Sequence, residues 1–316
     1  MERKAPKIII GIGIALIVFN GVWTLLNIKQ TNADKQKSTD NSQAAYPLLS
    51  KRIFAENQND MLLNFVPLRK DLDAAFKALP SGTLHSFYFE YLPSGTSIRN
   101  GSDNTLVAAS LIKVPLVMNL FKAAELGKVN LDSKVTITDQ QLDGAYGDLW
   151  KKGAGTEITL REAAKLALTE SDNTAAHIVF DAVNGLLTSD QESLNNLDIS
   201  QNMKEGQAVI DAKSYTSVLK SLFLASYVNR ASSQEILSYM SQSTATNRIT
   251  AQLPKDIPVA HKIGVYNSSW SESDCGIVYA TKRPYAICIM VGLPEEQANI
   301  FIANISKKIY DFVVSQ

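Results

Sequence analysis

The residues best suited to covalent chemistry are a serine and a lysine three positions apart, Ser110 and Lys113. On a helix, positions i and i+3 share a face, so the hydroxyl and the amine can meet. A serine hydroxyl is a weak nucleophile unless a base accepts its proton, and a lysine accepts one only when it is neutral. Burial among the apolar residues around Lys113, together with a second cation nearby, would lower its pKa. The pattern therefore suggests acyl transfer.

Alone, this pattern is more typical of an exposed helix start. The chain contains a second copy, Ser217 and Lys220, inside an ordinary amphipathic helix. A second candidate motif is the triplet Ser171-Asp172-Asn173, which lies between two expected helices. Its residue types would also suit a helix N-cap. A further SDN triplet, residues 102–104, is interpreted as a turn.

A third motif, Lys262-Ile263-Gly264, lies on an expected strand just before a hairpin. The glycine would let a ligand backbone approach closely, and the lysine would attract a carboxylate. Taken singly, this motif is better explained as an ordinary lysine on an edge strand than as a ligand-binding motif. Ser-x-x-Lys, Ser-Asp-Asn and Lys-x-Gly in that order, however, form the set found in class A β-lactamases and penicillin-binding proteins. From about residue 60 to its end the chain resembles that family, also in segments such as FYFEYLPSGTSI and EITLREAAKLALTESDNTAA.

The resemblance implies catalytic roles for three side chains. Ser110 would attack a carbonyl and form the acyl-enzyme, with Lys113 as its base, and Ser171 would pass a proton to the leaving nitrogen. Backbone N–H groups of Ser110 and Val265 would form the oxyanion hole. No metal and no cofactor enters this scheme.

The resemblance also implies a substrate-binding strand and loop. Asn173 would bind the amide side chain of the substrate and brace the lysine base, and Lys262 would attract the substrate carboxylate, with Gly264 beside it. Tyr146 or Trp150, in the segment GAYGDLWKKG, would either wall the cleft or simply pack. The implied partner is a β-lactam or a peptidoglycan stem peptide.

Two departures from the family pattern bear on activity. Ile263 stands where the family usually has Thr or Ser, and it cannot donate a hydrogen bond to a carboxylate. The glutamate that activates the deacylating water in class A β-lactamases also lacks a clear counterpart. The stretch QESLN, residues 191–195, is better interpreted as part of a helix, and Glu205 in the remnant loop 198–211 has no surroundings that recommend it as a base. We therefore expect slow release of the acyl group.

Two other functional classes remain as alternatives. One is a catalytically silent cell-wall-binding module with the same fold, which the isoleucine at 263 favours and the intact Ser, Lys and Asn residues disfavour. The other is a Ser-His-Asp esterase, which is disfavoured because the chain has no G-x-S-x-G and none of its three histidines has a recognisable partner.

The order of elements predicts an α+β fold of the β-lactamase type, with an antiparallel sheet flanked by helices plus an all-helical lobe at about residues 106–210. Helical spacing is present at 62–79 and 302–312. The sequence predicts strands at 85–92, 96–100, 257–265, 275–280 and 284–292. The cleft between the two lobes is the expected place for a site.

Composition excludes several classes. The 31 basic and 31 acidic residues cancel, which disfavours a nucleic-acid partner, and three scattered histidines with only two cysteines disfavour a metal site. Cys275 and Cys288 fall on adjacent expected strands, where a disulfide is conceivable but two buried free thiols are the favoured expectation. We expect a monomer.

The N-terminus predicts export. Basic residues precede an uncharged run at 8–28, which as a helix would span roughly 30 Å, one hydrocarbon thickness. An uncleaved transmembrane anchor, 1–28, fits better than a cleaved signal peptide because the run is long and no A-x-A site follows. A polar linker, 29–58, would then join the anchor to a catalytic domain, 59–316, on the outer side of a bacterial cell membrane.

Overall fold

The computed structural model describes residues 46–50, 63–101, 104–186 and 202–316. The expected anchor and most of the expected linker lie outside these ranges. Within them, no helix combines the length and the apolar character that a membrane crossing requires. All helices and strands of the described residues belong to one compact unit, Leu48–Gln316.

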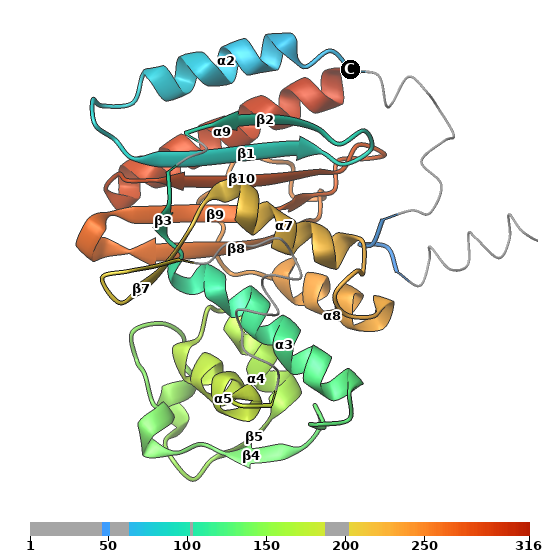
Figure 1. Cartoon of the computed structure of the whole chain (residues 1–316), viewed down its shortest axis with the longest axis vertical. Helices are drawn as coiled ribbons and strands as arrows, with labels where there is room; N and C mark the ends of the chain where they lie inside the picture. The colour runs from blue at the N-terminus through green and yellow to red at the C-terminus, as the bar shows by residue number, and fades with distance from the viewer. Residues whose placement is uncertain (1–45, 51–62, 102–103, 187–201) are drawn as a thin grey trace, which may run out of the picture. The chain divides into compact units, whose positions relative to one another are not determined.

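A five-stranded antiparallel sheet forms the larger layer, in the order β2-β1-β10-β9-β8 (Figure 1). All five strands expected from the sequence are confirmed, and their bounds are β1 His85–Tyr91, β2 Thr96–Asn100, β8 Val259–Tyr266, β9 Ser271–Val278 and β10 Tyr285–Val291. The last strand in the order, β8, carries the Lys-x-Gly motif and is an edge strand. An edge strand keeps one row of backbone groups free of strand pairing, which suits a binding surface.

The two terminal helices pack side by side on one face of the sheet, α2 Val66–Lys77 and α9 Glu295–Ser315 (Figure 1). Alternate residues of β1, Phe87 and Phe89, point toward them and join their apolar residues in one buried core. The other face of the sheet packs against α7, Ala212–Phe223, which is followed by α8, Arg230–Met240. The expected terminal helices are therefore confirmed.

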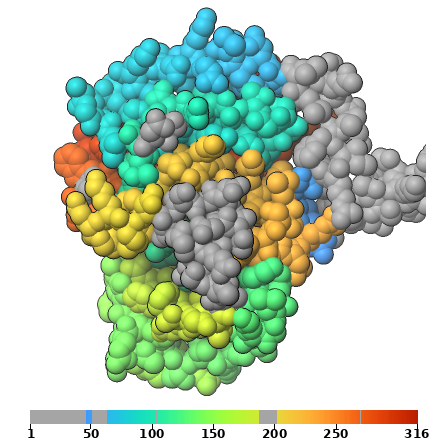
Figure 2. All heavy atoms as spheres, viewed as in Figure 1, coloured from blue at the N-terminus to red at the C-terminus, as the bar shows by residue number. Residues whose placement is uncertain are grey.

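The helical lobe contains α3 Lys113–Glu125, α4 Leu160–Thr169 and α5 Asn173–Val183. Figure 2 shows the green segments that carry these helices gathered at one end of the unit. Among the described residues, short 3₁₀ turns also occur at Ala109–Ile112, Asp139–Gln141, Leu149–Lys152 and Asn267–Ser269.

The expectation of an all-helical segment at 106–210 was wrong in part, because two small sheets lie within it. One has the order β3-β7-β6 and the other pairs β4 with β5. The bounds are β3 Leu106–Val107, β4 Lys134–Thr136, β5 Glu157–Thr159, β6 Asn202–Lys204 and β7 Gln207–Ile210. Strands of two to four residues are too short to produce a recognisable alternation of apolar and polar residues.

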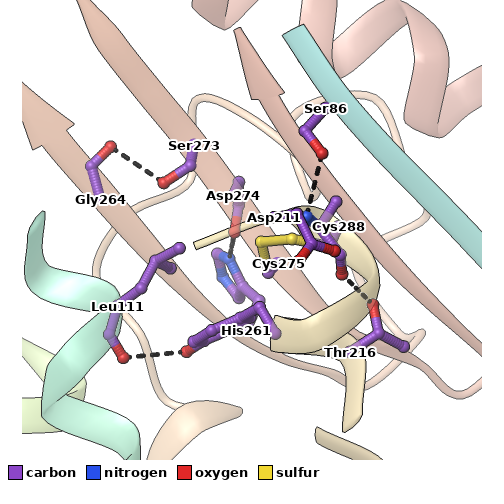
Figure 3. Close-up of a disulfide and its surroundings, with 12 residues drawn as sticks. Ser86, Leu111, Asp211, Thr216, His261, Gly264, Ser273, Asp274, Cys275 and Cys288 are labelled. Atoms are coloured by element: carbon purple, nitrogen blue, oxygen red, sulfur yellow. Dashed lines mark hydrogen bonds and ion pairs between the residues drawn. A yellow bond between two sulfur atoms is a disulfide. The ribbon is translucent and has the colours of Figure 1, made fainter. Parts of the chain in front are cut away.

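The two cysteines form a disulfide, which corrects the expectation of free thiols. Cys275 on β9 and Cys288 on β10 are direct partners in the strand register, and both are fully buried. Figure 3 shows the bond beside His261 and Asp274, and in the strand register Cys275 is the direct partner of Lys262 on β8. The pairing depended on a register that the sequence alone did not provide.

Removing this disulfide is expected to lower the free energy of unfolding by about 3 kcal/mol, because the bond closes a short loop in the unfolded chain. The two cysteines are 13 residues apart. Urea denaturation with and without reductant measures the loss, and a Cys275→Ala/Cys288→Ala variant serves as the control that no longer responds to reductant. Equal stability of the oxidised protein and this variant would contradict the expectation.

Candidate functional site

The proposed nucleophile lies on a tight turn. Ser110 belongs to the 3₁₀ turn Ala109–Ile112. The sequence had suggested a helix that starts at the serine, whereas the α-helix begins at Lys113. The residue before the serine, Ala109, has a left-handed backbone with φ of 45°. Such a conformation is costly for a residue with a side chain and is concentrated at functional sites. The turn keeps the serine and the lysine one turn apart.

Gly264 explains how this turn meets the edge strand. A Cβ added there would lie 2.5 Å from Ser273 Oγ and 2.7 Å from the carbonyl oxygen of Ala108, closer than real Cβ contacts allow. The glycine therefore permits the backbone just before Ser110 to pack directly on β8. The sequence reasoning had attributed this glycine to ligand approach, whereas the structure assigns the close approach to the protein's own backbone. Val265 follows it on the same strand, half-buried.

The Ser-Asp-Asn segment is held in place by its central residue. Asp172 is fully buried and caps α5, because its carboxylate accepts hydrogen bonds from Ala175 N and Leu149 N, each at 2.8 Å. The backbone N–H of Asn173 also donates to Tyr146 O at 3.0 Å. Ser171 has a left-handed backbone with φ of 57°. The capping role that the sequence allowed for this triplet is therefore present.

Lys113 connects the nucleophile turn to this segment. Its Nζ donates to Asn173 Oδ1 at 2.6 Å, to the backbone oxygen of Ser171, and to Ser171 Oγ at 3.5 Å. Within the described residues, no hydrogen bond joins this amine to the Ser110 hydroxyl. Catalytic hydrogen bonds often form only when substrate is bound, so this arrangement is compatible with a base role.

Lys262 reaches the same serine from the opposite lobe. Its Nζ donates to Ser171 Oγ at 2.7 Å, and the side chain is fully buried. Ser171 therefore lies between two lysines, one from α3 and one from β8. Such an arrangement can move a proton through the hydroxyl in either direction.

Burial is the main cause that lowers the pKa of both lysines. Burial lowers the pKa of Lys113 to about 8, although the Asp172 and Asp143 carboxylates act in the opposite direction. The pKa of Lys262 falls well below its usual range, first because of burial and then because of the Lys113 charge. A buried lysine that loses its proton near neutral pH can act as a base.

A cavity of about 430 Å³ opens beside Ser171 and Lys262, and we call it the Lys262 pocket. It is bounded by both lobes, as the sequence led us to expect. Its wall consists of Tyr146, Thr169, Glu170, Ser171, Ser243, Thr244, Ala245, Thr246, Asn247, Lys262, Ile263 and Glu295. The choice between the two candidate aromatics is resolved, because Tyr146 lines the pocket whereas the ring of Trp150 covers Gly144.

The second Ser-x-x-Lys and the further SDN triplet make contacts that explain them structurally. Lys220 of the second Ser-x-x-Lys pairs with Glu90 at 2.7 Å. In the other SDN triplet, Asn104 donates to His85 O at 2.9 Å, and its first two residues lie outside the described ranges. Glu205 is exposed at the turn between β6 and β7, in a left-handed conformation. The QESLN stretch, 191–195, also lies outside the described residues.

One sequence statement is corrected, because His261 has a carboxylate partner. Its Nδ1 lies 2.9 Å from Asp274 Oδ1, and both side chains are buried, as Figure 3 shows. No serine hydroxyl in the described part of the chain hydrogen-bonds to this histidine. The pair therefore does not complete a Ser-His-Asp triad.

Sequence reasoning missed a buried ion pair behind β8. Arg248 forms a salt bridge with Glu272, and each side chain is 1% exposed. The guanidinium also donates to the backbone oxygens of Gly264 and Ser273, at 3.2 and 2.7 Å, and so fixes the strand that carries the Lys-x-Gly motif. No motif flags this arginine, because its partners lie on β8, β9 and α9, between 16 and 51 residues away in the sequence.

An antiparallel sheet with a helical lobe, and a Ser-x-x-Lys turn facing a lysine-bearing edge strand, is the architecture of β-lactamase-like serine hydrolases. The chain belongs to the beta-lactamase enzyme family, whose model matches residues 67–313. It is similar to Beta-lactamase BRO-1 of Moraxella catarrhalis, with 24% identity over 227 residues that cover 65% of this chain and 72% of the relative. Beta-lactamase CARB-3 of Pseudomonas aeruginosa is 28% identical over 225 residues, covering 66% and 77%.

Solved structures share the fold. PBP-A superposes with a TM-score of 0.71 and 22% identity, covering 79% of this chain and 97% of PBP-A. A beta-lactamase from Sphaerobacter thermophilus gives a TM-score of 0.72 at 18% identity, covering 80% and 99%. A mutant of PBP-A has been solved as an acyl-enzyme complex with penicillin G. The expected α+β β-lactamase fold is therefore confirmed for the described residues.

Proposed function

We propose that this chain forms an acyl-enzyme at Ser110 with β-lactams or D-alanyl-D-alanine peptides and releases the acyl group slowly. The observation that carries the proposal is the convergence on Ser171 of two buried lysines, Lys113 from the nucleophile turn and Lys262 from β8. The penicillin complex of the structural neighbour PBP-A supports the same substrate class.

The chemistry follows from these contacts. Neutral Lys113 accepts the proton of Ser110 as the serine oxygen bonds to the substrate carbonyl, and the backbone N–H groups of Ser110 and Val265 stabilise the oxyanion. As the carbonyl carbon–nitrogen bond breaks, the leaving nitrogen takes a proton from Ser171, which recovers one from the lysines. Water then cleaves the ester, so that the serine regains its proton and the acyl group leaves as an acid.

We expect slow release because the described residues offer no suitable base for the deacylating water. Water needs a proton acceptor to attack the ester efficiently, and a positioned base contributes about 10²- to 10⁴-fold. Glu205 is exposed at a hairpin turn. The carboxylates that line the Lys262 pocket, Glu170 and Glu295, are also exposed, and neither hydrogen-bonds to Ser171 within the described residues.

Intact-protein mass spectrometry of the full chain tests acylation and release together. We expect a mass increase of one penicillin on mixing, located at Ser110 by peptide mapping, and a slow return to the original mass after free penicillin is removed. Hydrolysis of a chromogenic cephalosporin at ordinary enzymatic rates, about 1–10³ s⁻¹, would show that release is fast. Failure to acylate would refute the proposal as a whole.

Acylation is expected to accelerate as pH rises and to level off above the Lys113 pKa of about 8. Only the neutral amine accepts the proton, so each pH unit below this value should reduce the rate by about tenfold. Stopped-flow labelling with fluorescent penicillin between pH 5.5 and 9 measures the profile. A rate that is flat across this range, or that falls as pH rises from 6 to 8, would contradict Lys113 as the base.

The second candidate is a silent cell-wall-binding module, and Ile263 is the observation that favours it. Its side chain lines the Lys262 pocket where a carboxylate anchor would be useful, yet it has no hydrogen-bond donor. Peptidoglycan sedimentation distinguishes the two. Binding of the chain to peptidoglycan without any penicillin adduct would support the silent module.

We also propose that the full chain is anchored in the bacterial cell membrane with its catalytic domain outside the cytoplasm. The uncharged run at 8–28 and the basic residues before it support this topology. The disulfide supports it independently, because such bonds persist mainly in oxidising compartments. Protease treatment of intact cells should degrade the domain while cytoplasmic markers survive; protection of the domain would refute this topology.

A further inference from the structure

The Lys262 pocket has a charge pattern that acylation alone does not explain. Its wall includes one amine, Lys262, which a bound carboxylate would hold in its cationic form, and two carboxylates, Glu170 and Glu295. The lysine is 1% exposed, whereas both glutamates are exposed to solvent. A pocket built only for an anion would present cations and exclude carboxylates. The pattern instead suits an occupant with charges of both signs.

Arg248 does not alter this balance, although it lies behind the same strand. Its guanidinium is fully buried and is used by Glu272, Asn299, and the backbone oxygens of Gly264 and Ser273. It is absent from the pocket wall. Its charge is paired with Glu272; it still lowers the pKa of Lys262, but it places no second cation on the pocket wall.

The Glu295 carboxylate acts across the pocket. It belongs to the first turn of α9, on the sheet side, whereas Tyr146 belongs to a loop of the helical lobe. After burial, the Glu295 charge is the next largest cause that raises the pKa of Tyr146. Position in a first helical turn could by itself account for an acidic residue. Glu296 also lies in the first turn of the helix but does not line the pocket. Comparing the two glutamates therefore separates a role in the pocket from a role at the helix terminus.

The pocket also offers unused donors for a carboxylate. Thr246 and Asn247 are exposed on its wall, and their side chains make no hydrogen bond within the described residues. A threonine hydroxyl and an asparagine amide can both donate to a carboxylate. They can therefore donate the hydrogen bond to a carboxylate that Ile263, on β8, cannot donate.

Resting on the proposed acylation at Ser110, we propose that the Lys262 pocket selects a leaving residue that carries both a carboxylate and a cationic amine. Lys262, Thr246 and Asn247 bind the carboxylate. Glu170 and Glu295 bind the ammonium group. The bond changes are those of acylation: the Ser110 oxygen–carbon bond forms, the amide carbon–nitrogen bond breaks, and the leaving nitrogen takes the proton from Ser171.

Competition against fluorescent-penicillin labelling of the full chain tests this preference. Two acylated peptides are compared at pH 7 and low salt, one ending in D-alanyl-D-alanine and the other in D-alanyl-D-2,3-diaminopropionate, which adds only an amine to the last β-carbon. Each exposed ion pair contributes up to about fivefold, so we expect the amine-bearing peptide to compete about fivefold to tenfold better. Raising NaCl to 0.5 M should reduce this ratio, because salt screens exposed charges.

Substitutions assign the preference to the pocket. Glu295→Gln should reduce the ratio about threefold, Glu170→Gln should reduce it similarly, and Glu296→Gln should leave it unchanged. A ratio near one in the unmodified protein, or an equal fall in the Glu296→Gln protein, would overturn this inference while labelling of Ser110 leaves the proposed function intact. Failure of labelling itself would instead refute the proposed function, and this inference with it. The peptide pair and the salt series need no variant, so a misfolded variant leaves the test complete.

Discussion

Replacing Lys113 with methionine is expected to slow penicillin acylation of Ser110 by about 10²- to 10⁴-fold, the contribution of a well-placed general base. Methionine keeps the length and the burial of the side chain but cannot accept a proton. Lys113 directly follows the nucleophile turn, and among the described residues its amine is the one basic group within hydrogen-bonding distance of both Ser171 and Asn173. Stopped-flow labelling with fluorescent penicillin measures the rate.

The duplicated motif provides matched controls for this prediction. Ser110→Ala should abolish the covalent adduct, whereas Ser217→Ala, in the second Ser-x-x-Lys, should label at the original rate. Near-UV circular dichroism shows whether each variant is folded. Labelling of a folded Lys113→Met protein within threefold of the original rate would assign the base to another group, of which Lys262 would be the first to test.

Replacing Arg248 with methionine is expected to reduce the free energy of unfolding by about 3–5 kcal/mol at pH 7, because it leaves the Glu272 carboxylate buried without its partner. Burial raises the pKa of Glu272, and Arg248 opposes that rise. Without the arginine the pKa rises further, so the folded protein holds the carboxyl group in its neutral form up to a higher pH. The loss of stability should therefore be smaller at pH 5 than at pH 7.

Urea denaturation at the two pH values measures this loss. Arg99→Met, which replaces an exposed arginine on β2, should change stability by no more than about 0.5 kcal/mol. The double variant Arg248→Met/Glu272→Met should recover part of the loss, because removing both charges of a buried pair is far less costly than removing one. A double variant less stable than Arg248→Met would show that the unpaired Glu272 carboxylate is not the cause of the loss.

Much of the site could be predicted because its residues lie in short local motifs. Ser110 and Lys113 are one turn apart, and Asp172 caps the helix that follows it, so their local geometry depends on few neighbours. The five main strands and both terminal helices were also predictable, because each is long enough to show its periodicity. The short strands β3 to β7 lacked that signal.

Contacts between distant segments could not be predicted in this way. The Arg248–Glu272 pair, the Cys275–Cys288 bond and the carboxylate partner of His261 all depend on strand register. A shift of one residue would turn the strand side chains of these pairs to the other face of the sheet, and no local pattern specifies that choice. The expectation of free thiols failed for this reason.

The order and the chemistry of the motifs follow directly from the amino-acid sequence, because local spacing along a helix or strand is a property of the chain. Tertiary structure decided which groups meet: Lys262 of β8 and Lys113 of α3 share the hydroxyl of Ser171, more than 50 residues from either. Packing of the two lobes buries both amines, and it is this burial that lowers their pKa values. The reactivity of the site is therefore a product of the packed fold.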